Sequence, residues 1–112
     1  MKIFEVLDKQ IIAYHVTPKR NLKYIMKEGL TPQIGSNSSS YGETEERLYF
    51  FPTVVDAEDA AMNWLGDQYE DEILALLEVD ITGIPMKKDV EWELYTNQPI
   101  TPERIKIIST DF

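Results

Sequence analysis

Short blocks of apolar and polar residues follow one another along the first part of the chain. The run from Ile11 to Tyr14 is apolar and typical of a strand. Pro18 biases the residue before it away from helical dihedrals, so we expect the strand to stop there and His15 to lie at its end. Residues 2–7 alternate more weakly and predict either a second, short amphipathic strand or a cap on the sheet.

A helix is predicted directly after this strand. Leu22, Ile25 and Met26 recur at helical spacing, which places them on one face. Pro18 suits the first turn of a helix, and Gly29 is a typical helix stop. The pattern therefore predicts a helix of two to three turns that ends at Gly29.

Residues 31–47 have no apolar periodicity and are rich in Gly, Ser, Asn and Glu. They predict a long loop, and loops of this length in small domains are usually functional or disordered. We expect Ser36 to Glu46 to be mobile without ligand.

The middle of the chain returns to regular patterns. The aromatic run from Leu48 to Phe51 predicts a strand that stops at the following proline. Thr53 is a suitable N-cap for a helix that runs to about Trp64, with Ala57 among the small residues of its apolar face.

Three further strands are predicted. Residues 73–79 form the most continuously apolar segment and are expected to be a central strand that is buried on both faces. Residues 90–95 alternate strictly, so Glu91 and Glu93 should share one face. Residues 105–108 predict a last strand. Together these elements predict an α+β fold, with a mixed, split sheet around residues 73–79 and two or three short helices.

Composition limits the possible chemistry. A chain of 112 residues with 43% hydrophobic content fits one domain, residues 1–112, with a single core. The chain has no cysteine and one histidine, so thiolate chemistry is excluded and no metal site is expected.

The net charge of −9 makes a nucleic-acid partner unlikely, because binding to phosphate backbones depends on Lys and Arg. A basic partner, or simply a role of the charge in solubility, fits better. The N-terminal residues lack a long apolar segment, so we expect no signal peptide, no membrane span and a cytoplasmic location. The oligomeric state is left open.

Five short motifs in order then suggest a relationship. The chain contains Tyr-His-Val-Thr at the first strand, Asn-Leu-x-x-Ile-Met-x-x-Gly-Leu-x-Pro in the first helix, Leu-Tyr-Phe-Phe, Leu-Ala-Leu-Leu-Glu-Val and Glu-Trp-Glu-Leu-Tyr. This succession resembles the ADP-ribosyltransferase superfamily. It is closest to the His-Tyr-Glu branch, which includes diphtheria toxin and the poly(ADP-ribose) polymerases, with the RNA 2'-phosphotransferases as relatives. The resemblance extends over residues 11–108.

The resemblance implies a pocket that binds NAD. It makes His15 the residue that hydrogen-bonds a ribose hydroxyl, with Thr17 as the small hydroxyl residue two positions later, and Tyr49 the residue that stacks on nicotinamide. The catalytic glutamate is Glu91 by the polymerase pattern, which we favour, or Glu93 by the toxin-like Glu-x-Glu pattern.

Two positions differ from the family pattern. Val16 stands where the polymerases have glycine, although its backbone can still contact a carboxamide. Ala57 lies near the place where many relatives present a serine hydroxyl to nicotinamide. Without the resemblance, His15 could simply satisfy a turn, Tyr49 could be an ordinary sheet aromatic, and the glutamates could form a solvated face.

Three functions are therefore open. The first is a small NAD-dependent mono-ADP-ribosyltransferase that acts on a macromolecular acceptor, with a protein favoured. The second is a catalytically inactive member of the same fold that binds NAD, ADP-ribose or a related nucleotide. The third is an acidic interaction or inhibitor protein that presents its carboxylates to a basic surface. Fold-level similarity does not choose between them.

Overall fold

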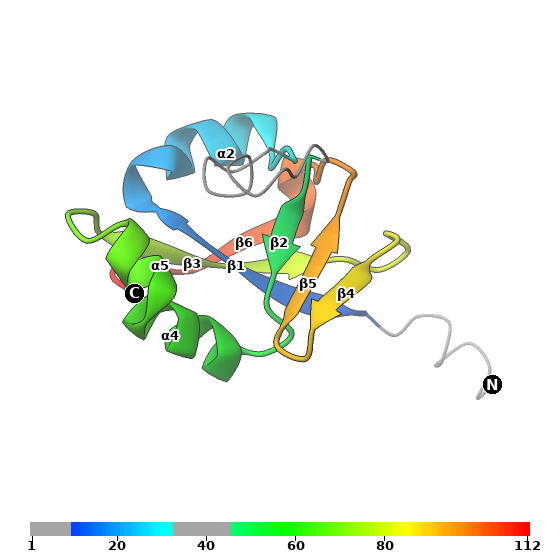
Figure 1. The fold of residues 1–112 in the computed structure, drawn as a ribbon. Helices are drawn as coiled ribbons and strands as arrows, with labels where there is room; N and C mark the ends of the chain where they lie inside the picture. The colour runs from blue at the N-terminus through cyan, green and yellow to red at the C-terminus, as the bar shows by residue number, and fades with distance from the viewer. Residues whose placement is uncertain (1–9, 33–45) are drawn as a thin grey trace.

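A computed structural model describes residues 10–32 and 46–112 (Figure 1). The predicted strand at residues 2–7 and the predicted mobile segment from Ser36 to Glu46 lie almost wholly outside these ranges. The elements, in chain order, are β1 (Ile12–Pro18), η1 (Lys19–Asn21), α2 (Leu22–Glu28), β2 (Leu48–Phe50), α4 (Val54–Met62), α5 (Trp64–Gln68), β3 (Leu74–Asp80), β4 (Lys87–Val90), β5 (Glu93–Thr96), η2 (Pro102–Arg104) and β6 (Ile105–Ser109).

The first sheet is three-stranded and antiparallel, with the order β1-β3-β6. Its central strand, β3, confirms the prediction of a central strand at residues 73–79. Leu77 and Val79 contribute to one hydrophobic core, whereas Leu74 and Leu76 contribute to a second core. Because alternate residues of a strand point to opposite faces, β3 is buried on both sides.

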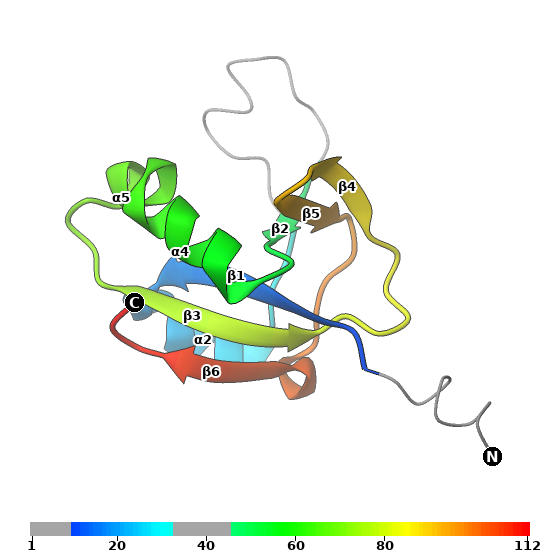
Figure 2. The same ribbon diagram turned by 90° about the horizontal axis from the view of Figure 1, so that it is seen from below.

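Helices cover both faces of this sheet. In Figure 1 the sheet is seen nearly edge-on, with α2 on one side and α4 and α5 on the other. Figure 2 shows α2 behind β3 and β6 in the perpendicular view. Ile25 of α2 belongs to the first core, and Ala57 and Ala60 of α4 belong to the second. The fold is thus α+β, as predicted, with a hydrophobic core on each side of one sheet.

The second sheet is also antiparallel and three-stranded, with the order β2-β5-β4. The described strands form no parallel pair, so the prediction of a mixed sheet is wrong. The predicted single strand over residues 90–95 is also wrong, because Glu91 and Trp92 form the turn of a hairpin between β4 and β5. Each strand of a hairpin alternates as a single strand does, and this turn lacks the Asn-Gly or Asp-Gly pair that marks such turns in a sequence.

The two sheets are joined by one pair of backbone hydrogen bonds. The Tyr14 amide donates to the Phe51 carbonyl at 2.8 Å, and the Phe51 amide donates to the Tyr14 carbonyl at 2.7 Å. This bridge aligns the end of β2 with the middle of β1. It corrects the expected position of His15, which lies within β1 rather than at its end, because the strand continues to Pro18.

The helix boundaries follow the local sequence signals with one exception. Gly29 ends α2 with φ of 87°, and the Thr53 side chain caps α4 by accepting a hydrogen bond from the Asp56 amide. The predicted helix to Trp64 is interrupted at Asn63, whose dihedrals are not helical, and α5 begins immediately afterwards.

No helix in residues 10–32 and 46–112 has both the length and the apolar character needed to cross a membrane.

We predict that Gly29→Ala destabilises the protein far more than Gly83→Ala. Both glycines have positive φ, but a Cβ on Gly29 would collide with the Ile100 carbonyl, whereas a Cβ on Gly83 meets no atom within 4 Å. We expect a loss of about 3 kcal/mol or more at Gly29 and about 1 kcal/mol at Gly83, measured by urea unfolding. Equal losses would show that the contact between Gly29 and Ile100 does not constrain the fold.

Candidate functional site

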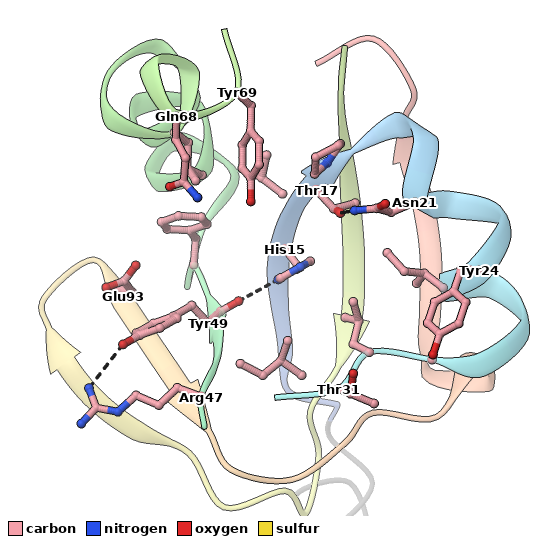
Figure 3. A pocket seen from close by; sticks show the side chains of 18 of the residues that line it. His15, Thr17, Asn21, Tyr24, Thr31, Arg47, Tyr49, Gln68, Tyr69 and Glu93 are labelled. Carbon is pink, nitrogen blue, oxygen red and sulfur yellow. Dashed lines mark hydrogen bonds between the residues drawn. The ribbon is translucent and has the colours of Figure 1, made fainter. Parts of the chain in front are cut away.

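A cavity of about 590 Å³ lies where the two sheets meet. Residues of β1, α2, β2, α5 and β5 line it (Figure 3). The volume is in the range of small-molecule sites, which occupy roughly 300–1,000 Å³. His15, Tyr49 and Glu93 all line this cavity, so residues that are distant in the sequence are brought together from three strands.

His15 is held by a backbone carbonyl of the other sheet. Its Nδ1 lies 2.8 Å from the Tyr49 carbonyl oxygen. Since a carbonyl can only accept, Nδ1 carries the proton, and Nε2 of the neutral ring is an acceptor. Burial lowers the pKa of His15, and the hydrogen bond to Tyr49 opposes this shift without cancelling it. The imidazole is therefore neutral at pH 7.

Tyr49 is the middle residue of β2. Its neighbours Leu48 and Phe50 are buried in the first core, so alternation directs the Tyr49 side chain to the opposite face. The Tyr49 ring lies 5.8 Å from the Tyr95 ring, and its hydroxyl accepts a hydrogen bond from Arg47 Nη1 at 3.3 Å. Tyr49 is therefore fixed at its ring and its hydroxyl, with part of its surface at the cavity.

The two candidate glutamates occupy different environments. Glu93 is the first residue of β5, is 8% exposed and lines the cavity. The Glu91 side chain is 93% exposed in the hairpin turn, where Lys88 Nζ lies 3.3 Å from its carboxylate, and Glu91 is not part of the cavity wall. The expectation that both glutamates share one face is wrong, because the turn ends the alternation between them.

Two of the three remaining residues that were expected to contact a ligand line the cavity, and the third does not. Val16 and Thr17 line the cavity, and the Thr17 hydroxyl lies 3.4 Å from Asn21 Nδ2, which donates to it. Ala57 does not reach the cavity, because it is completely buried where α4 packs against the first sheet. The resemblance places Ala57 beside the ligand, whereas in the structure it lies between α4 and the first sheet. A small residue there serves close packing between helix and sheet.

Several cavity residues were missed by sequence reasoning. Arg47 lies two positions before Tyr49, so period-two alternation could have placed both on one face. Its guanidinium carbon lies 4.3 Å from the centre of the Tyr95 ring, within the range of a cation–π contact. Gln68 is the last residue of α5 and Tyr69 follows it, and no local signal in the sequence identifies them as cavity residues. Arg47 and Glu93 are the charged residues among those found to line the cavity.

Comparison with models of protein families and with curated proteins found no match for this chain. Among the described residues, no three acidic or histidine side chains converge as a metal site would require. The function is therefore inferred from the geometry of the cavity.

We predict that His15 makes the protein less stable as pH falls below its ordinary pKa of about 6.5. Because the native-state pKa is lower, the unfolded chain binds a proton first, which favours unfolding by up to about 1.4 kcal/mol per pH unit. The chain has one histidine, so His15→Asn, which retains a donor for the Tyr49 carbonyl, should remove this loss. Urea unfolding between about pH 7.5 and about 5.5 measures this loss of stability. Few carboxylates titrate in this range, so their contribution is small. Parallel curves for the two proteins would contradict the burial of a neutral His15.

Proposed function

We propose that this protein is a small NAD-dependent mono-ADP-ribosyltransferase that transfers ADP-ribose to a macromolecular acceptor, with a protein favoured. The observation that carries the proposal is the position of Glu93. A nearly buried carboxylate lies in the wall of a cavity that also contains a neutral histidine and a half-buried tyrosine. These are the residue types that the His-Tyr-Glu resemblance implies, and each comes from a different strand.

The reaction breaks the bond between the ribose C1' and the nicotinamide nitrogen. The bonding electron pair moves to the nitrogen, so nicotinamide leaves as a neutral ring and positive charge develops on the ribose. A nucleophile of the acceptor, or water, then forms the new bond at C1' and loses its proton. Catalysis requires a group that stabilises the positive charge more in the transition state than in the ground state.

Glu93 fits that requirement. Its carboxylate anchors a ribose hydroxyl and faces the developing charge from a site with little exposure to water, where electrostatic interactions are stronger than in bulk solvent. His15 accepts a hydrogen bond from a second ribose hydroxyl through Nε2. The Tyr49 ring provides an aromatic surface for nicotinamide and holds the leaving group in position.

The topology also supports the proposal. Two small antiparallel sheets meet at the cavity, with His15 on one and Tyr49 and Glu93 on the other. This arrangement is compatible with a split-sheet ADP-ribosyltransferase fold. The residue type at position 57 counts in a different direction, because alanine lacks the hydroxyl that many members of the resembled family present to nicotinamide. It favours a second candidate function, namely a protein that binds NAD or ADP-ribose in this cavity without turning it over.

Replacement of Glu93 by glutamine distinguishes these functions. Gln keeps the size of the side chain and removes its charge, so we expect nicotinamide release to fall by about 10²-fold or more. The affinity for NAD, measured by calorimetry, should change much less, because the charge on the ribose develops only in the transition state.

Glu91→Gln is the matched control. It makes the same chemical change two residues away, on a side chain that is exposed and outside the cavity. Its rate of nicotinamide release should equal that of the unmodified protein. A loss at Glu91 with none at Glu93 would overturn the assignment. Tight NAD binding with no nicotinamide release by the unmodified protein would favour the binding function.

A further inference from the structure

A second cavity, of about 250 Å³, lies beside the first. It is formed by α4, the start of α5 and the turn between β4 and β5. Its wall consists of Asp56, Asp59, Ala60, Asn63, Trp64 and Trp92. Trp64 lines both cavities, so the two share this side chain in their walls.

Two tryptophans form the aromatic part of this wall. Their ring centres are 6.4 Å apart, and the ring planes are inclined by 48°. Trp64 is 42% exposed and Trp92 is 43% exposed, which is high for such large apolar side chains. Trp64 also lies against Phe51, at 6.3 Å between ring centres, so the pair is attached to the second core. Indole faces attract cations more strongly than other aromatic side chains do.

Carboxylates form the other part of the wall. Asp56 and Asp59 are three residues apart on α4 and so lie on one face of the helix. The Asn63 side chain donates a hydrogen bond to the Asp59 carbonyl at 2.7 Å, which fixes its amide at the edge of the cavity. No lysine or arginine is found among the residues that line this cavity. The cavity thus combines aromatic faces with negative charge.

We propose that this second cavity binds the guanidinium group of an arginine side chain on a partner protein. A guanidinium is planar, so it can stack on an indole while its N–H groups point to carboxylates in its own plane. An ammonium group is compact and strongly hydrated and makes poorer use of two aromatic faces. The net charge of −9 adds a long-range attraction for a basic partner.

The location gives this binding a role that rests on the proposed function. Trp92 directly precedes Glu93, and Trp64 is shared with the first cavity. A partner anchored here by an arginine therefore passes beside the site where ADP-ribose is released. The second cavity is a docking site for the acceptor. Guanidinium binding itself requires neither NAD nor turnover.

Tryptophan fluorescence tests the binding directly, because the chain has two tryptophans and both line this cavity. The probe is the capped tripeptide Gly-Arg-Gly, added without NAD. We expect a saturable change in fluorescence that weakens with added salt. The same peptide with citrulline, which has the shape of arginine without its charge, should give no saturable change. Equal responses to the two peptides would overturn the proposal.

Matched double variants test the carboxylates. Asp56→Asn with Asp59→Asn should raise the Kd for the arginine peptide about tenfold or more, since it removes both charged acceptors. Glu58→Gln with Asp67→Asn makes the same change in net charge on exposed residues of α4 and α5 that do not line the cavity. This control should change the Kd about twofold or less, because salt screens the attraction between the peptide and charges outside the cavity. Equal effects of the two double variants would overturn the proposal.

Different results would reject the docking site and the proposed function. NAD hydrolysis to free nicotinamide needs no acceptor, and it should be retained in Asp56→Asn with Asp59→Asn, while transfer to an arginine-containing peptide falls. Peptide binding without nicotinamide release would support the docking site and reject the enzyme. Nicotinamide release with no peptide binding would support the enzyme and reject the docking site.

Discussion

The site depends on the hydrogen bonds that join β1 to β2 and to the residue after it. Tyr14 and Phe51 exchange backbone hydrogen bonds, and next to them His15 Nδ1 donates to the Tyr49 carbonyl. In the part of the chain that the structure describes, these hydrogen bonds join two sheets whose strands pair only within each sheet. A buried, unpaired carbonyl is costly, so the histidine contributes to the architecture as well as to the cavity.

This junction also determines the electrostatics of the cavity. It fixes the proton of His15 on Nδ1, and burial keeps the ring neutral. The cavity therefore offers an acceptor nitrogen, an aromatic face at Tyr49 and a carboxylate at Glu93, with Arg47 as the cation beside Tyr49. Neutral imidazole and anionic carboxylate together suit a ligand that presents hydroxyl groups and develops positive charge.

Strong local signals allowed much of the fold to be predicted from the sequence. The continuous apolar run identified β3, and Gly29 marked the end of α2. Three of the four catalytic candidates also reached one cavity, although their roles remain predictions. The wrong predictions concern positions whose structure is determined by tertiary contacts. The turn at Glu91 has no turn signature, so alternation placed that residue with Glu93, and the packing of Ala57 against the sheet depends on contacts that no local pattern contains.

A neutral His15 joins the two sheets, and the proposed function has its Nε2 accept a hydrogen bond from NAD. Because the chain has one histidine, a long-range ¹H–¹⁵N NMR spectrum reports on it without ambiguity. The free protein at neutral pH should contain the tautomer with the proton on Nδ1. Under the proposed function, addition of NAD should then shift the Nε2 resonance, because a ribose hydroxyl would donate to it. A proton on Nε2 in the free protein would contradict the hydrogen bond from His15 Nδ1 to Tyr49. An Nε2 resonance that saturating NAD leaves unchanged would contradict the proposed contact with the ribose.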